Sequence, residues 1–340
     1  MSVFLEACRR RPTPYTPVWL MRQAGRYQPE YRALRARHPF VELCRRSDLA
    51  AEITLRPVEQ LGVDAAILFA DILLVLEPLG IGFRFDEHDG PRIDAPIRTP
   101  TDVERVAAEP DVEGALAFVM QTVRLVRREL PSSIPLIGFA GAPFTLASYV
   151  LEGRGARDWH QTRRFMLSEP AAFDELLRRL TEAVTRYLRA QIAAGCDAVQ
   201  LFDSWVGALG PHEYERHVLP HVRRLFAALG SEVPRIYFGT GNPALYPLLA
   251  RSGADVIGVD WRVDLGEAWD RIGDLAVQGN LDPAYLLAPV DAMQQAARRV
   301  LDAARGRSGH IFNLGHGVLP SSPVDSVRRL VDFVHEASAR

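Results

Sequence analysis

The chain has 340 residues, of which 48% are hydrophobic and 24% charged, and its formal net charge is -2. Such a composition is typical of a soluble globular protein, and a nearly neutral chain has no overall attraction for nucleic acid. No apolar run reaches the roughly 18 residues that a membrane helix needs. We therefore expect neither a membrane nor a nucleic-acid partner.

The cysteines indicate a reducing environment. Cys8, Cys44 and Cys196 are odd in number and far apart, so they form no disulfide framework and no CxxC metal pair. The first residues also lack the basic start and the long apolar stretch of a signal peptide. We expect a cytoplasmic protein.

All 40 basic residues are arginine, because the sequence contains no lysine. A Schiff base requires a lysine amine, whether it forms with a carbonyl substrate or with pyridoxal phosphate. Both kinds of catalysis are therefore excluded, and the lysine of the phosphate-binding P-loop signature is missing as well.

Eight short apolar runs rich in Val, Ile, Leu and Phe recur along the chain, and helical patterns lie between them. The runs are continuous rather than alternating, as expected for parallel strands that are covered on both faces. They occupy residues 18–21, 65–70, 136–139, 198–202, 235–238, 255–259, 275–278 and 310–313.

The clearest helix is predicted for residues 173–194, where Leu, Val and Ile recur every fourth residue and arginines occupy the other side. Gly195 suits a helix end in the left-handed conformation. Similar patterns predict helices over residues 112–130, 291–304 and 322–337.

Eight strands alternating with helices predict an α/β fold, a single (β/α)8 TIM barrel formed by one domain over residues 1–340. Residues 83–85 and Ile93, on either side of an Asp89-Gly90 turn, indicate a small hairpin inserted after the second strand. The alternative is an open doubly wound sheet, which usually has fewer strands and a Gly-rich fingerprint after the first one.

The first strand ends in a turn that contains two arginines, Arg22 and Arg26, and further arginines follow, including Arg35. Arginine holds carboxylates with a two-pronged set of donors and stays charged at any working pH. The turn therefore indicates a site for an anion with several carboxylates. The alternative is a solvated basic helix start.

Because a barrel carries its active site on the loops after its strands, polar residues at the other strand ends are candidates as well. Asp71 lies among apolar neighbours after the second strand, where a carboxylate needs a cationic or donor partner. Tyr149, Ser204 and His316 follow strands three, four and eight. A capping Asp71 and surface hydroxyls at Tyr149 and Ser204 remain the alternatives.

A metal site is poorly supported by the sequence. Zinc sites need clustered His, Cys or carboxylate ligands, and none of the predicted strand ends carries a cysteine. Cys196 precedes the fourth strand, which would place it at the opposite end of a barrel.

At these positions the chain resembles the uroporphyrinogen decarboxylase family, and the resemblance covers essentially the whole length. Phe144 and Ser148 stand where many members have Trp and Thr, and both changes are mild. The matching motifs are residues 17–27, 29–32, 69–73, 141–149, 202–205 and 312–317.

The resemblance implies a (β/α)8 barrel that works as a homodimer without metal or organic cofactor. It implies a carboxy-lyase that converts the four acetate side chains of uroporphyrinogen III to methyl groups, giving coproporphyrinogen III in haem biosynthesis. Asp71, Arg22 and Arg26 would be catalytic. The substrate would be bound by Arg22, Gln23, Ala24, Gly25, Arg26, Arg35, Asp71, Tyr149, Ser204 and His316.

Three other functions remain open at this point. Zinc-dependent corrinoid methyltransferases have a similar fold but need a thiolate-rich site late in the barrel, whereas this chain has no cysteine after Cys196. A non-catalytic tetrapyrrole carrier would share the binding residues. A barrel for another polycarboxylate would share the arginines.

Overall fold

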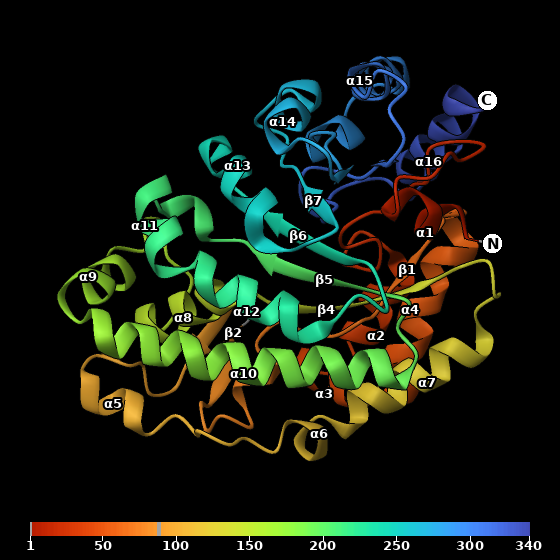
Figure 1. The fold of residues 1–340 in the computed structure, drawn as a ribbon. Coiled ribbons are helices and arrows are strands. Elements are labelled where there is room, and N and C mark those ends of the chain that lie inside the picture. The colour runs from red at the N-terminus through yellow and green to blue at the C-terminus, as the bar shows by residue number, and fades with distance from the viewer. Residues whose placement is uncertain (1, 87–89) are drawn as a thin grey trace.

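The computed structural model describes residues 2–86 and 90–340, which form an α/β fold (Figure 1). In this part of the chain, a curled parallel sheet has seven strands in the order β1-β4-β5-β6-β7-β8-β9. These strands are β1 (Ala66–Ile67), β4 (Leu136–Gly141), β5 (Ala198–Asp203), β6 (Arg235–Gly239), β7 (Val256–Gly258), β8 (Ala276–Gln278) and β9 (His310–Ile311).

The predicted first strand, residues 18–21, does not form a regular ladder. Val18 makes only an isolated parallel bridge with Phe312. Side chains take the place of ladder partners: the Val18 N–H donates to the Asp64 carboxylate at 2.7 Å and the Met21 N–H to the Asn313 side chain at 3.0 Å. The other seven predicted strands are confirmed.

Residues 17–21 nevertheless hydrogen-bond on both sides. The Phe312 N–H donates to the Pro17 carbonyl at 2.8 Å, just after β9. On the other side, the Asp64 N–H donates to the Val18 carbonyl at 2.8 Å, just before β1. This segment therefore links the first and last strands of the parallel sheet.

The helices agree with the sequence patterns except in one place. The helix predicted for residues 112–130 is interrupted at Leu116, where φ is -108°, so that it forms α6 and α7. The α-helices are α1 (Val3–Cys8), α2 (Pro29–Arg35), α3 (Phe40–Arg45), α4 (Ser47–Leu61), α5 (Pro100–Glu104), α6 (Val112–Ala115), α7 (Ala117–Glu129), α8 (Pro143–Glu152), α9 (His160–Ser168), α10 (Pro170–Ala194), α11 (Pro211–His217), α12 (Leu219–Leu229), α13 (Tyr246–Leu249), α14 (Leu265–Ile272), α15 (Val290–Ala303) and α16 (Val324–Ser338).

Two further strands, β2 (Phe83–Asp86) and β3 (Gly90–Ile93), lie after β1 in the chain and pair antiparallel, with Phe83 opposite Ile93. The turn expected at Asp89-Gly90 lies partly outside the described residues. Phe83 and Phe85 stack edge to face at 5.9 Å, and Phe85 continues this contact to Phe40 of α3. The pair of strands is therefore attached to the α3 side of the molecule.

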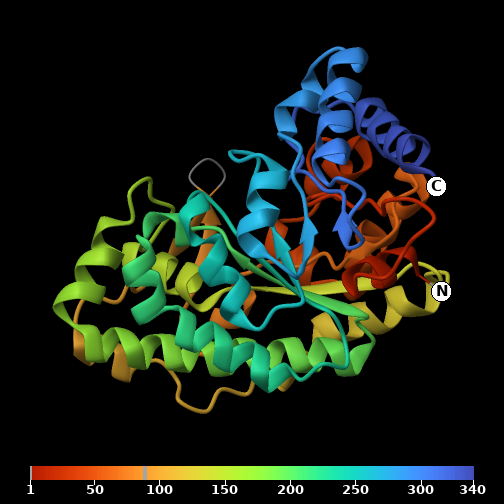
Figure 2. The same cartoon turned by 45° about the horizontal axis from the view of Figure 1, so that its top comes forward.

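Helix α10 is the longest of the described helices that cover the sheet. Leu176, Leu180 and Leu188 on its apolar side are fully buried. Gly195 ends it with φ 125°, a positive value that favours glycine. Figure 2 shows the C-terminal helices, in blue, on the opposite side of the sheet from α10, and both chain ends on one side of the molecule. In the described part of the chain, no helix combines the length and the apolar character needed to span a bilayer.

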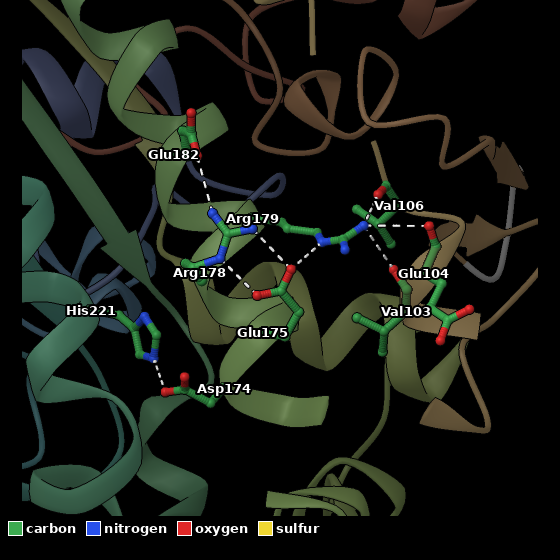
Figure 3. A network of polar contacts seen from close by, with 9 residues as sticks. All are labelled: Val103, Glu104, Val106, Asp174, Glu175, Arg178, Arg179, Glu182 and His221. Carbon is green, nitrogen blue, oxygen red and sulfur yellow. Dashed lines mark hydrogen bonds and ion pairs between the residues drawn. The ribbon is translucent and has the colours of Figure 1, made fainter. Parts of the chain in front are cut away.

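Charged side chains on α10 attach the neighbouring segments to it (Figure 3). Glu175 accepts from Arg178 at 2.7 Å and from Arg179 at 2.6 Å, and these arginines lower the pKa of its carboxyl to about 2. Arg179 also donates to the backbone carbonyl of Val103, in α5, and to that of Val106, just after α5. Arg186 of α10 donates to the Pro110 carbonyl at 3.2 Å, so two guanidinium groups of α10 hold the segment from α5 to Pro110.

We predict that Asp64→Asn destabilises the fold by about 2 kcal/mol, because its carboxylate accepts three bonds and an amide oxygen cannot replace both oxygens. The donors are the Val18 N–H at 2.7 Å, the Tyr15 hydroxyl at 2.9 Å and His335 Nε2 at 2.7 Å. Urea unfolding measures the change. The matched control is Asp325→Asn, whose side chain is 77% exposed; its effect should stay within about 0.5 kcal/mol. Equal stability of the two variants would contradict the prediction.

Candidate active site

A cavity of about 550 Å³ lies where β5 to β9 end, at their carboxyl ends. Each of these strands contributes residues from the loop that follows it, as expected for a parallel sheet whose loops build a site. The lining includes Arg157, Trp159, Ser204, Trp205, Thr240, Gly241, Trp261, Arg262, Asp282, His316 and Gly317.

One wall of the cavity is aromatic. Trp159 and Trp205 lie with ring centroids 4.6 Å apart, and Tyr149 contacts both rings edge to face at 5.7 and 5.8 Å. Trp159 comes from the long connection before α9, where it adopts the left-handed conformation with φ 50°. This wall suits a ligand that carries aromatic rings.

The loop that carries Ser204 and Trp205 is positioned by Asp203, whose side chain is fully buried. Asp203 accepts from the Thr145 hydroxyl and from the Tyr237 hydroxyl, both at 2.7 Å. Burial raises the pKa of the Asp203 carboxyl to about 6, although both hydrogen bonds oppose this shift. Thr145 also accepts from the Trp205 N–H at 3.3 Å. Asp203 thus joins α8 to the end of β5.

His316 and Trp261 form another part of the lining, with ring centroids 5.9 Å apart and nearly perpendicular planes. Burial, and after it the positive charges of Arg22 and Arg262, lower the pKa of His316 to about 4. The imidazole is therefore uncharged at neutral pH, so it can donate one hydrogen bond and accept another.

Arg262 adds a positive charge that sequence reasoning did not identify. Its guanidinium lies 3.8 Å from the centre of the Trp261 ring and 3.0 Å from the buried Asp260 carboxylate. Its side chain is nevertheless 48% exposed. The exposed part faces a cavity that Arg157 also lines.

Arg22 leaves the turn after residues 17–21 with φ 61°, the left-handed conformation that is uncommon for arginine. Its side chain lies against Gly317, where any Cβ atom would collide with the aliphatic part of Arg22. Gly317 itself lines the cavity. The glycine therefore lets the arginine approach the site.

Asp71 lies four residues after β1 and is partly exposed. Removal of the carboxyl from water raises its pKa to about 6, against the opposing effects of a bond from the Leu73 N–H, at 2.8 Å, and of the charge of Arg22. The pKa of Tyr149 is raised to about 12, first by burial and then by the charge of Asp71. Asp71, Arg22 and Tyr149 therefore lie within electrostatic range of one another.

Two further predicted arginines, Arg26 and Arg35, lie on the same side of the site as Asp71, because all three charges act on the pKa of Tyr31. Arg26 and Arg35 lie near Tyr31, since both charges act to lower the Tyr31 pKa, which burial raises to about 12. Arg26 is exposed, whereas Arg35 donates to the His38 carbonyl at 2.6 Å. Both arginines lie outside the described lining of the cavity.

The turn residues Gln23, Ala24 and Gly25 support the arginines. The Gln23 N–H donates to the Leu20 carbonyl at 2.9 Å, and its side chain bonds the Leu20 N–H and the Ala65 carbonyl. The Gly25 N–H donates to the Gln28 side chain at 3.1 Å. These bonds fix the turn from which Arg22 and Arg26 extend.

Sequence reasoning identified Ser204 and His316, which line the cavity, but missed Arg157, Trp159 and Arg262. The first two belong to an irregular connection with no periodic pattern, and Arg262 was one arginine among 40 basic residues. Among the described residues, no group of three or more His, Cys, Asp or Glu side chains is placed to hold a metal ion.

A parallel sheet with arginines, aromatic rings and carboxylates at its carboxyl end is typical of an α/β protein whose loops bind an anionic ligand. Comparison with known families makes this more specific. The family model described as uroporphyrinogen decarboxylase (URO-D) matches residues 1–337. The chain belongs to the uroporphyrinogen decarboxylase family.

Curated relatives agree with this assignment over full length. The chain is 52% identical to the uroporphyrinogen decarboxylase of Carboxydothermus hydrogenoformans over 340 residues, covering 99% of this chain and 97% of that protein. It is 53% identical to the uroporphyrinogen decarboxylase of Sorangium cellulosum, with 98% and 95% coverage.

A solved structure, a methyltransferase from Methanosarcina mazei, has the same fold. The TM-score is 0.84 at 19% identity, with 98% of this chain and 97% of that chain covered. At this identity the likeness concerns the fold alone, because one fold supports many activities.

We predict that Asp71→Asn stabilises the protein above pH 6. The folded-state pKa of about 6 exceeds the ordinary value of 3.8, so the parent loses stability as the pH rises from about 4 to about 6, where the folded carboxyl resists ionisation. The amide does not ionise, so the variant does not lose this free energy of unfolding, and the loss in the parent reaches at most about 3 kcal/mol. Urea unfolding at several pH values measures the difference; a difference that stays constant between pH 4 and 7 would contradict it.

Proposed function

We propose that this chain decarboxylates uroporphyrinogen III, converting its four acetate side chains to methyl groups and giving coproporphyrinogen III in haem and porphyrin biosynthesis. Membership of the family and relatives of that name at about half identity support this assignment. The observation that carries it is Asp71, a carboxylate within electrostatic range of Arg22 at the open end of the sheet.

The binding chemistry matches the substrate. Uroporphyrinogen has eight carboxylates, and the exposed Arg22 and Arg26 side chains have guanidinium donors for them. Arg35, with the backbone of Gln23, Ala24 and Gly25, completes this side of the proposed site. Tyr149, Ser204 and His316 are the further substrate contacts in this proposal.

The reaction needs a place for the electron pair that the departing carbon dioxide leaves behind. Protonation of the pyrrole at the α-carbon next to the ring carbon that bears the acetate creates a cation. The bond between the acetate methylene and its carboxylate then breaks, and its electron pair forms an exocyclic double bond to the ring and neutralises the cation. Protonation of this methylene gives the methyl group, and loss of the first proton from the α-carbon restores the pyrrole. Because the substrate supplies its own electron sink, the proposed reaction needs neither metal nor organic cofactor.

Asp71 would stabilise the cationic pyrrole and accept hydrogen bonds from pyrrole N–H groups. Its pKa of about 6 leaves the carboxyl mainly ionised at neutral pH, and it is held by the Leu73 N–H at 2.8 Å. A positioned negative charge beside a developing positive one is the electrostatic stabilisation that accelerates such steps.

We further infer a closed (β/α)8 barrel with the β2–β3 hairpin as an insertion. The hydrogen bonds that residues 17–21 make to Phe312 and to Asp64 support an eighth position between β9 and β1. A homodimer in the cytoplasm completes the proposal, by resemblance to the family.

The primary test is anaerobic incubation of the metal-stripped protein with chemically reduced uroporphyrinogen III, followed by chromatographic counting of product carboxylates. Stepwise conversion from eight carboxylates to four is the expected result. Unchanged substrate that still binds would replace the proposal with a carrier function. Unchanged substrate without binding would assign the site to another polycarboxylate.

We predict that Asp71→Asn lowers kcat by about 100-fold or more while KM changes little, because the lost charge acts mainly on the transition state. Steady-state kinetics of the first decarboxylation measure both constants. The control Asp325→Asn lies on the exposed start of α16 and should keep parental values. A rise in KM that accounts for the whole loss would give Asp71 a binding role only.

Arg22→Gln should raise KM at least about tenfold, since a charge-assisted bond to a substrate carboxylate is lost. The control is Arg328→Gln, an exposed arginine on α16. Equal KM values for the two variants would show that Arg22 does not contact the substrate.

A further inference from the structure

The cavity at the carboxyl ends of β5 to β9 is lined by two arginines that the proposed function does not use, Arg157 and Arg262. Its lining also includes Gly317, against which the aliphatic part of Arg22 lies. Three arginines from separate parts of the chain therefore lie beside one cavity.

Uroporphyrinogen has more carboxylates than the proposed site has arginines. One guanidinium holds one carboxylate in the two-pronged manner, so Arg22, Arg26 and Arg35 account for three of the eight. Arg26 and Arg35 also lie outside the described lining of the cavity. Substrate carboxylates that enter the cavity therefore need other donors.

Arg262 is held in place and keeps donors for a ligand. Its guanidinium lies 3.8 Å from the centre of the Trp261 ring, and its Nη1 lies 3.0 Å from the Asp260 carboxylate. That carboxylate also accepts from the Gly241 N–H at 2.6 Å and from the Arg262 N–H at 2.8 Å. Because one nitrogen of the guanidinium makes the ion pair and the side chain is 48% exposed, its other nitrogens can bind a carboxylate.

Arg157 is an unpaired cation on an anchored connection. It is exposed, and it makes no hydrogen bond or ion pair in the described part of the chain. Two residues later, Trp159 is 3% exposed, and its ring centroid lies 4.6 Å from that of Trp205. Glu152 accepts from the N–H and the hydroxyl of Thr162 at 3.0 and 3.2 Å, which joins the two ends of the connection. The backbone that carries Arg157 is therefore fixed beside the cavity.

The charges around the cavity favour an anion. Asp282 is the one carboxylate of the described lining, and it accepts from the backbone N–H two residues later at 2.9 Å. Asp260 lies buried beneath the lining. Against these two carboxylates stand the positive charges of Arg157, Arg262 and Arg22, so positive charge is in excess.

We propose that Arg157 and Arg262 bind substrate carboxylates inside this cavity and thereby determine the affinity for an octacarboxylate. This inference rests on the proposed function, because it assigns a further part of the same substrate. The three tryptophans of the lining would pack against the pyrrole rings. The two arginines act on binding, whereas the breaking of the carbon–carbon bond is left to the groups named above.

Arg157→Gln should raise the KM for uroporphyrinogen III about fivefold and change kcat by less than about twofold, because an exposed ion pair is lost. Steady-state kinetics of the first decarboxylation measure both constants. Arg157→Lys keeps the charge and should recover most of the loss. The matched control is Arg163→Gln on α9, an exposed arginine outside the lining, which should keep the parental KM. Equal KM values for Arg157→Gln and this control would overturn the proposal.

Ionic strength separates a lost charge from a changed shape. In about 0.5 M salt, the ratio of the KM of Arg157→Gln to that of the parent should fall towards one, because salt screens exposed charges. A ratio that does not change with salt would mean that the substitution acts through the shape of the connection, and it would overturn the proposal.

Arg262→Gln should raise KM at least about tenfold, because this guanidinium is already held in place for a ligand. Glutamine keeps a donor for Asp260, so the buried carboxylate keeps a partner. The matched control is Arg271→Gln, since the Arg271 side chain is also 48% exposed but lies on α14, outside the lining. A parental KM in Arg262→Gln would overturn the proposal.

The same measurements separate this inference from the proposed function. A parent protein that converts uroporphyrinogen III while both variants keep its KM overturns the inference alone. A parent protein without turnover refutes the proposed function, and quenching of the fluorescence of the lining tryptophans then gives the dissociation constant of uroporphyrinogen III. Weaker binding by Arg157→Gln than by Arg163→Gln would still support the inference, whereas equal or absent binding would overturn it.

Discussion

Residues 17–21 hydrogen-bond next to the first strand and next to the last strand of the parallel sheet, and these bonds determine where the candidate site lies. The Phe312 N–H binds the Pro17 carbonyl on one side, and the Asp64 N–H binds the Val18 carbonyl on the other. This segment ends directly at Arg22, whose side chain meets Gly317 of the loop after β9. The first and last parts of the chain thus build one site because backbone polar groups must find partners.

Three carboxylates near the carboxyl end of the sheet differ in the number of hydrogen-bond donors and positive charges around them, and this difference indicates different roles. Asp260 is paired with Arg262, and Asp203 accepts from two hydroxyls. Asp71 accepts one backbone N–H and has only the more distant charge of Arg22 in addition. The carboxylate with the fewest partners is the one with capacity left for a ligand.

The fold is shared with a protein of different name, so function depends on the residues placed at the strand ends. The methyltransferase of Methanosarcina mazei superposes with a TM-score of 0.84 at 19% identity. The family assignment instead follows from the full-length match and from relatives at about half identity. In this chain the loops carry arginines, tryptophans and several carboxylates, among them Asp71, whereas the sheet beneath them is ordinary β/α packing.

The sequence by itself determined the strands β1 and β4 to β9 and the long helix α10, and it pointed to Ser204 and His316, which line the cavity. It also predicted Arg22 and Asp71 as site residues, which stay a prediction. These follow from local periodicity and from the rule that loops after parallel strands meet. Tertiary structure alone decided that residues 18–21 form side-chain bonds in place of a ladder, that Leu116 interrupts a helix, and that Trp159 and Arg262 join the cavity. The reason is physical: those outcomes depend on partners far away in sequence, and a local pattern carries no information about them.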